Sequence, residues 1–268
     1  MRRFSPRFTA AAIAAAATTA VTVGFLADTA LAAPSNTTGT TAKAHPTKTS
    51  AQLPPDATAQ QVQAAATTAI NARIGALNDA AGKVQKAADL GGDQAALLHT
   101  LQGDVAGLQH LGQKIAADTT APTARADYEQ IFANFRVYAL VLPGNRLVGS
   151  IDHTDNTIDP RLTTVAGKIS ARVTPADQAQ VQPLLADLAI QVSASKSATA
   201  GLTPALEGYT PAQWNANHHL LTDAKGKVRS ARGAVIKARA DAKQAASDVR
   251  ANRGAKHART HGTGTKPA

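Results

Sequence analysis

The sequence predicts an all-α protein: an elongated antiparallel helical bundle of about five to six helices with coiled-coil-like heptad packing. Aliphatic residues recur at three- and four-residue spacing through most of the chain after residue 57, which is the period of an α-helix. Proline, glycine and Thr or Asp capping residues separate these periodic segments. Towards the C-terminus, apolar residues return every seven positions, which is the period of coiled-coil packing.

The first two helices are expected at about 56–89 and 94–118. Each carries an aliphatic stripe on one helical face. The Gly-Gly pair at 91–92 should end the first helix, and Asp93 should cap the second. Because the connection is short, the two helices should lie antiparallel.

A third helix is expected to begin near Pro122 and to enter an aromatic-rich window at residues 128–142. Four of the six aromatic residues beyond residue 32 lie in this window, namely Tyr128, Phe132, Phe135 and Tyr138. A lone strand would have no partner, so we expect the helix to give way to an extended, buried segment ending at Pro143-Gly144.

The simplest interpretation of the aromatic window is that its bulky side chains close the core of an alanine-rich bundle. An alternative is an apolar ligand pocket, with Arg136 as its polar anchor. If Arg136 has no ligand, we expect its guanidinium to pair with a carboxylate such as Asp152 or Glu129.

The remaining helices are marked by Thr/Asp-Pro signals. Asp159-Pro160 should cap and restart or kink the helix that begins at Leu147. Thr174-Pro175-Ala176-Asp177 should start a helix that runs to about Ala200, and Thr210-Pro211 should open the longest helix, at about 211–253. The heptad residues of that helix are Trp214, Leu221, Val228, Val235, Ala242 and Val249. Alanine or asparagine stands three residues after each, so that a neighbouring helix can approach closely.

Residues 1–32 are predicted to be a signal peptide. Three arginines precede an uncharged, alanine-rich run, and small residues allow cleavage between Ala32 and Ala33. An uncleaved anchor is the alternative, because the run approaches the length of a membrane span. A leader of this kind implies a secreted, extracytoplasmic protein of the cell envelope, with no transmembrane span expected in the mature chain.

Composition divides the rest of the chain into three regions. Residues 33–57 are rich in Thr, Ala and Pro and are expected to be a disordered linker. Residues 58–253 form the predicted helical bundle domain. Residues 254–268 lack apolar periodicity and are expected to be a disordered basic tail.

Positive charge is concentrated at the C-terminal end. The chain has 28 Lys and Arg against 18 Asp and Glu, a net charge of +10. Residues 211–268 alone hold 12 basic and 3 acidic residues, so the excess belongs to the last helix and the tail. The candidate anion-binding residues are Lys225, Arg229, Arg232, Arg239, Lys243, Arg250, Arg253, Lys256 and Arg259.

This charge distribution limits the kinds of partner that we expect. In an extracytoplasmic compartment the available anions are phospholipid head groups, wall-linked polymers and other envelope proteins. Nucleic acid is not an expected partner in an extracytoplasmic compartment, and no aromatic residues interleave with the basic ones. The alternative is structural: the stripe of Lys225, Arg232, Arg239 and Arg253 makes interhelical salt bridges, and the stripe of Arg229, Lys243 and Arg250 is a solvated face. The sequence leaves the oligomeric state open.

Catalytic and metal-binding patterns are not evident. The carboxylates of Asp152, Asp155 and Asp159 have a spacing that suggests calcium ligands, but the glycine and terminal glutamate of an EF-hand loop are missing. We therefore interpret Asp159 as a helix cap and the other two as part of a solvated turn. The chain has no cysteine and no nucleophile motif with its partners, so we expect no enzyme, no metal site and no cofactor.

Several motifs carry a resemblance to a known family. They comprise Arg136-Val137-Tyr138, Leu140 and Pro143, followed by Asp152 and by the segment that contains Trp214. They resemble a family of uncharacterised secreted, alanine-rich α-helical proteins of actinobacteria, over most of residues 60–253. The resemblance implies export and an all-helical fold, and it brings no activity. The fingerprint residues are Phe132, Phe135, Arg136, Tyr138, Pro143, Asp152 and Trp214.

The sequence thus favours a secreted, non-enzymatic structural or interaction protein of the cell envelope. A first alternative is a binder of an anionic envelope polymer or membrane surface, acting through the basic C-terminal helix and tail. A second alternative is a carrier of a small apolar ligand, using the aromatic window.

Overall fold

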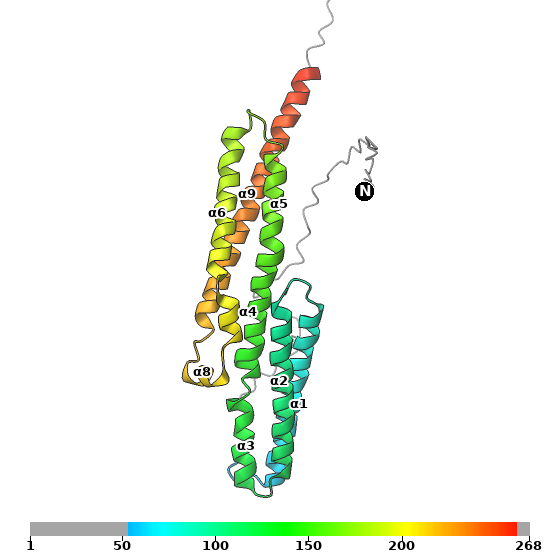
Figure 1. The fold of residues 1–268 in the computed structure, drawn as a ribbon, viewed down its shortest axis with the longest axis vertical. Coiled ribbons are helices and arrows are strands. Elements are labelled where there is room, and N and C mark those ends of the chain that lie inside the picture. The colour runs from blue at the N-terminus through cyan, green and yellow to red at the C-terminus, as the bar shows by residue number, and fades with distance from the viewer. Residues whose placement is uncertain (1–52, 262–268) are drawn as a thin grey trace, which may run out of the picture. The chain divides into compact units, whose positions relative to one another are not determined.

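The computed structural model describes residues 53–261, with side chains to residue 253 (Figure 1). These residues form helices and no strands, so the predicted all-α bundle is confirmed. The helices are α1 Ala59–Lys86, α2 Asp93–Ala117, α3 Ala121–Ala133, α4 Leu142–His153, α5 Asp159–Ser170, α6 Gln178–Thr199, α7 Leu202–Glu207, α8 Pro211–Ala216 and α9 Thr222–His261. Two π-helical segments, η1 Val137–Val141 and η2 Thr154–Ile158, lie among them. The predicted signal peptide, its Ala32/Ala33 cleavage site and most of the linker lie outside the described residues.

Helices α1 and α2 run antiparallel, as predicted. The Gln63 amide at the start of α1 donates to the Ile115 carbonyl (3.1 Å) near the end of α2. At the other end, the Gln94 amide donates to the Val84 carbonyl (2.9 Å). The chain turns between them through Gly91, whose φ of +54° favours glycine. The predicted capping role of Asp93 is wrong, because Gly92 occupies the cap position and Asp93 is the first helical residue.

The aromatic window is helical rather than extended, so the predicted extended segment is wrong. Helix α3 ends at Ala133, and after three residues the chain re-enters helix through η1 and α4. The Leu142 N–H donates to the Val137 carbonyl, five residues back, which is the π-helical pattern. Pro143 does not end this helix, because proline lacks an N–H and fits the first turn of α4.

The interruption predicted before Pro160 is present as η2, which joins α4 to α5 without a loop. Asp159 is nevertheless not a cap. It is the first residue of α5, its side chain makes no capping hydrogen bond, and it is fully buried. The sequence pattern did not predict this position of Asp159, because a proline that follows an aspartate is equally compatible with a continuous helix after a π-bulge.

The predicted single helix over 211–253 is broken. Thr210 and Gln213 form a capping box that starts α8, but the chain leaves helix at Asn217 (φ −144°, ψ 97°). The Asn217 side chain accepts a hydrogen bond from the His219 N–H (2.9 Å), a local bond that competes with helix. Helix α9 starts only at Thr222, and it continues to His261 rather than ending at 253.

The heptad stripe of α9 faces the interior. All nine of its positions from residue 221 to residue 249 are buried: Leu221, Ala224, Val228, Ala231, Val235, Ala238, Ala242, Ala245 and Val249. Helix α6 packs along α9. The Asn252 amide in the later part of α9 donates to Asp177 just before α6 (2.6 Å), which shows that the two helices run antiparallel. The knobs-into-holes geometry of a coiled coil remains a prediction.

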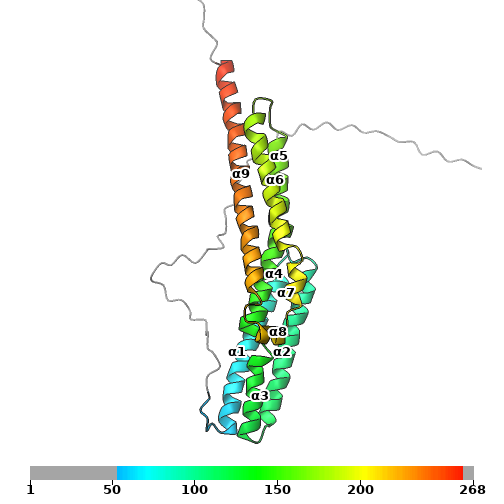
Figure 2. The same ribbon diagram turned by 90° about the vertical axis from the view of Figure 1, so that its left-hand side faces the viewer.

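Two clusters of buried apolar residues hold the helices together. The first is built from α1, α2, α3, α4 and α7 with the start of α9, and the second from α5, α6 and the rest of α9. Figures 1 and 2 show α5, α6 and α9 side by side, and α1, α2 and α3 side by side. Leu53 and Ala57 pack on the first cluster, so the helical domain includes residues just before the predicted boundary at 58. No helix in the described part of the chain is long and apolar enough to cross a membrane.

Candidate functional site

One side of α9 carries most of its positive charge. We call this side the basic flank; it occupies two adjacent heptad positions beside the buried stripe. All seven of its residues are exposed. They are Lys225, Arg229, Arg232, Arg239, Lys243, Arg250 and Arg253. The acidic residues Asp223, Asp241 and Asp248 occupy heptad positions on the opposite side of the stripe, so they do not interrupt the flank.

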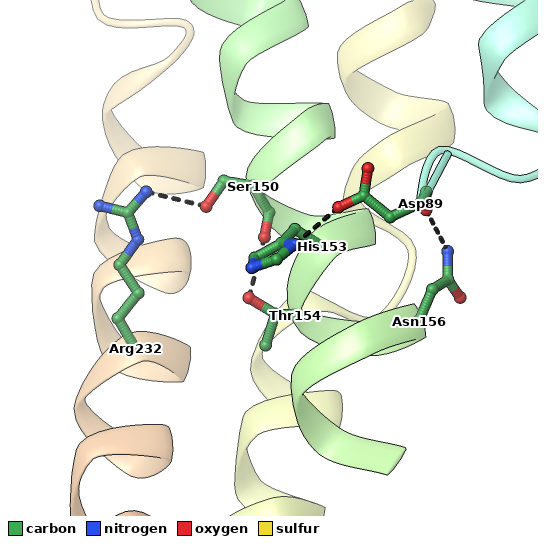
Figure 3. Close-up of polar contacts among 6 residues, drawn as sticks. All are labelled: Asp89, Ser150, His153, Thr154, Asn156 and Arg232. Carbon is green, nitrogen blue, oxygen red and sulfur yellow. Dashed lines mark hydrogen bonds and ion pairs between the residues drawn. The ribbon is translucent and has the colours of Figure 1, made fainter. Parts of the chain in front are cut away.

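Two residues of the basic flank bond to neutral oxygens. The Arg232 Nη2 donates to the Ser150 hydroxyl of α4 (2.8 Å; Figure 3), and the Arg253 Nη2 donates to the Arg172 carbonyl (3.3 Å). The bond of Arg232 positions its guanidinium without neutralising the charge. The pKa of Asp177 is lowered mainly by the hydrogen bonds that Asp177 accepts from Thr174 and Asn252, and the positive charge of Arg253 also contributes to this shift. Arg239 also interacts with other parts of the chain.

The other four residues of the flank make no side-chain hydrogen bond or ion pair with the described part of the chain. They are Lys225, Arg229, Lys243 and Arg250. Ile236 lies among them with 66% of its surface exposed. The side chains of Lys256 and Arg259 lie beyond the described ones, although the helical backbone of α9 extends past both residues.

The aromatic window encloses an arginine that the sequence analysis missed. The Arg73 guanidinium lies 4.5 Å from the centre of the Phe132 ring and 5.5 Å from that of Tyr138, and Arg73 is 8% exposed. Its Nη1 donates to the Ala69 carbonyl (3.0 Å). Burial lowers the pKa of Arg73, and Tyr138 and Tyr128 act in the opposite direction. The signal was its position in the apolar stripe of α1, between Ile70 and Leu77.

The aromatic side chains themselves are only partly core. Tyr128 is buried and meets Phe132 edge-on (5.1 Å between ring centres). Phe135 is half-buried and covers Gly107 of α2 so closely that a Cβ there would lie 2.7 Å from the ring. Tyr138 is 43% exposed, and its hydroxyl donates to the Ala72 carbonyl (3.1 Å). The window therefore joins α1, α2 and the α3–α4 connection, and most of its rings already have partners.

Arg136 does not pair with a carboxylate, so that prediction is wrong. Its Nε donates to the Asn215 side-chain oxygen (2.6 Å), and the Asn215 amide donates to the Ala133 carbonyl (3.0 Å). The sequence could not show this pairing, because it depends on α8 folding back onto α3. Trp214 of α8 is half-buried against the first apolar cluster.

A second candidate site is a hollow of about 720 Å³ with an acidic lining. We call it the acidic hollow. Its walls come from residues 88–93, 151–157 and 199–204, and the lining includes Asp89, Asp93, Asp152 and Asp155 but no lysine or arginine. A smaller hollow of about 160 Å³ lies between α1 and α2. Neither hollow is lined by the rings of the aromatic window.

Hydrogen bonds tie the walls of the acidic hollow together. The His153 Nδ1 lies 2.6 Å from an Asp89 carboxylate oxygen, and the Asn156 amide donates to the Asp89 carbonyl (2.9 Å; Figure 3). On the far wall, the Thr199 hydroxyl lies within hydrogen-bond distance of the Asp155 carboxylate (3.2 Å). These contacts hold the 88–93 turn and the start of the α6–α7 connection against η2.

The acidic residues here do not form the solvated turn that the sequence predicted. Asp152 is 5% exposed, and its Oδ2 has no hydrogen-bond partner among the described residues. Burial raises the pKa of Asp152 to about 7, and Asp93, Asp155 and Glu207 add to the effect. Burial also raises the pKa of Asp155 and of Asp159. Within the described residues, no three acidic or histidine side chains are arranged to hold a metal ion.

Comparison with protein-family models, curated proteins and solved structures finds no match to this chain. The resemblance to secreted, alanine-rich actinobacterial proteins therefore stays a prediction. Inferences about function therefore rest on the sequence itself and on the basic flank, the aromatic window and the acidic hollow.

Proposed function

We propose that this protein is a secreted, non-enzymatic helical interaction module of the cell envelope, and that the basic flank of α9 binds an anionic envelope polymer or membrane surface. One observation carries the proposal. Lys225, Arg229, Lys243 and Arg250 are exposed without a side-chain partner in the described chain, while the acidic residues of α9 lie on the other side of its buried stripe. The leader-like first 32 residues support the extracytoplasmic location.

The geometry suits an extended partner with repeated negative charges. Residues seven positions apart on a helix are separated by about 10 Å along its axis. The flank therefore presents a row of cations rather than a pocket for one small anion. The α6 and α5 contacts of the buried stripe keep α9 in place, so the row is preformed and the partner bears little of the ordering cost.

The test is binding of the full-length chain to vesicles with about one-third anionic phospholipid, compared with neutral vesicles. We expect anionic vesicles to retain the protein and neutral ones not to. Retention should fall steeply between about 0.1 M and about 1 M salt, because the screening length shrinks from about 10 Å to about 3 Å. Salt-insensitive retention would contradict the proposal. A soluble phosphate polymer as competitor separates a wall-polymer preference from a membrane preference.

Matched variants locate the contact. The triple variant R229Q/K243Q/R250Q removes three outward charges from the flank and spares Arg232, Arg239 and Arg253. The control K83Q/K86Q/R146Q removes three exposed charges from α1 and α4. We expect the flank variant to bind at least about tenfold more weakly and the control to bind like wild type. Equal weakening would mean that only net charge matters. A 1–253 truncation tests whether Lys256, Arg259 and the rest of the tail contribute.

The apolar-ligand carrier has less support. The rings of Phe132 and Tyr138 contact the Arg73 guanidinium, and the ring of Phe135 packs on Gly107. Neither described hollow is lined by these rings. The sequence alternative in which Arg136 anchors a ligand also loses support, because the Arg136 side chain is bonded to Asn215. A purely structural role with an envelope protein as partner remains the outcome if vesicles and polymers fail to bind.

A further inference from the structure

We propose that the acidic hollow is a binding site for an organic polycation, a ligand with ammonium groups on a flexible aliphatic chain. The site is independent of the basic flank. Its volume, about 720 Å³, lies within the range of small-molecule sites in proteins. Its walls are drawn from three separate parts of the chain, which the Asp89, Asn156 and Thr199 hydrogen bonds hold together.

The charge of the lining selects the sign of the ligand. Four carboxylates line the hollow, and Asp89 is engaged by His153. The other three, Asp93, Asp152 and Asp155, have no lysine or arginine beside them in the lining. Lys196 of α6 attracts Asp155 and Asp159, but it is exposed and is not part of the lining. An anion would therefore be repelled, and a cation would meet several carboxylates.

Asp152 is the feature that a merely acidic surface would not have. Its side chain lines the hollow and is 95% removed from solvent, its Oδ2 lacks a hydrogen-bond donor among the described residues, and the carboxyl is hydrogen-bonded to that of Asp93, which requires a proton on one of the two. A buried carboxylate without a donor is unfavourable unless it takes up a proton or meets a cation. An ammonium group of a ligand would supply both the charge and the missing donor.

The arrangement favours an organic cation over a metal ion. No three acidic or histidine side chains in the described region are placed to coordinate one ion. Asp89 and Asp93 come from one wall of the hollow, and Asp152 and Asp155 come from another. Ammonium groups separated by methylenes can reach different walls at once. The same walls include apolar residues that can contact the methylenes, among them Leu90 and Ile151.

Binding should release a proton. Asp152 has a pKa of about 7, with burial as the main cause and Asp93 of α2, Asp155 of η2 and Glu207 of α7 facing it. A cation stabilises the ionised carboxylate, so the affinity should increase from pH 6 to pH 8. In calorimetry the observed heat should then depend on the ionisation enthalpy of the buffer.

The experiment is calorimetric titration of the full-length chain with spermidine, and with 1,8-octanediol as a neutral probe of similar length. We expect spermidine to bind, more tightly at pH 8 than at pH 6, and octanediol not to bind. Asp152→Asn should weaken spermidine binding about tenfold or more, the free energy of one charge-assisted hydrogen bond. Asp79→Asn removes an exposed carboxylate of α1 that is not part of the lining and should leave the affinity unchanged.

A second pair of variants does not disturb Asp152. Gly92 lines the hollow, its φ of −70° suits any residue, and a Cβ there would meet nothing within 4 Å. Gly92→Lys places an ammonium group at the rim and should compete with spermidine, whereas Gly92→Gln should not. Four results would overturn the proposal: no binding at millimolar spermidine, equal affinity for octanediol, equal effects of D152N and D79N, or equal effects of G92K and G92Q.

Discussion

At the residue scale, the polar groups that matter most here are those that the helical pattern hides. Arg73, Asp152 and Asp159 are nearly or fully buried. The apolar stripe of α1 indicates that Arg73 faces the interior, but the spacing of residues does not show which side chains surround any of the three. Arg73 lies against aromatic rings, which attract a cation through their negative faces. Asp152 has no cation beside it; burial, together with the charge of Asp93 and a hydrogen bond to it, favours its protonated form.

The protonation of Asp152 should make stability depend on pH. Its pKa in the folded chain is about 7, above the value of about 3.9 of an unfolded aspartate. The folded state therefore holds more protons between these values, and the free energy of unfolding falls as the pH rises through this window. Replacing Asp152 with asparagine removes the ionisation and keeps a donor towards Asp93. We expect D152N to stabilise the protein by about 2 kcal/mol at pH 8.

Urea unfolding at several pH values measures this effect. The stabilisation by D152N should shrink towards zero as the pH falls from 7 to about 4. D79N, which alters an exposed carboxylate of α1, should show no comparable trend. Destabilisation by D152N at pH 8 would show that the ionised carboxylate is well accommodated in the folded chain.

At the element scale, the sequence predicted helices well wherever apolar residues repeat without interruption. The buried stripe from Leu221 to Val249 was predictable in full, since it depends only on spacing. Segment junctions were less predictable. Residues 134–142 and 217–221 depart from the expected structure because π-helical bonds and the Asn217 side chain satisfy the backbone locally. The bonding of Arg136 to Asn215 depends on that second junction, so spacing alone could not predict it.

Small residues in the α9 stripe should set the distance between α6 and α9. Ala238 and Ala245 are completely buried, so a larger side chain there would push against the neighbouring helix. We expect Ala238→Leu to destabilise the protein by about 1–3 kcal/mol through overpacking. Ala240→Leu, on the exposed side of the same helix turn, should change stability by less than about 0.5 kcal/mol. Equal effects in chemical denaturation would mean that α9 is not closely packed at Ala238.

At the scale of the whole described domain, the two apolar clusters have different compositions. The first contains leucine, isoleucine and aromatic side chains from many helices, and the second draws more of its buried residues from alanine and valine on α6 and α9. Burial of smaller side chains removes less apolar area from water and contributes less free energy. The second cluster, which supports the basic flank, should therefore open more readily than the first.

Native-state hydrogen exchange tests this difference. Leu188→Ala, at a fully buried position in the second cluster, should lower protection mainly in α5, α6 and the later part of α9. Leu108→Ala, equally buried in the first cluster, should instead lower protection mainly in α1, α2 and α3. Each substitution should destabilise its own cluster by about 2–5 kcal/mol. A uniform loss of protection from either variant would show that the domain opens as one cooperative unit.

A selective loss from Leu188→Ala would mean that the basic flank depends on a locally opening part of the fold. Its binding to anions should then weaken in this variant before the first cluster unfolds.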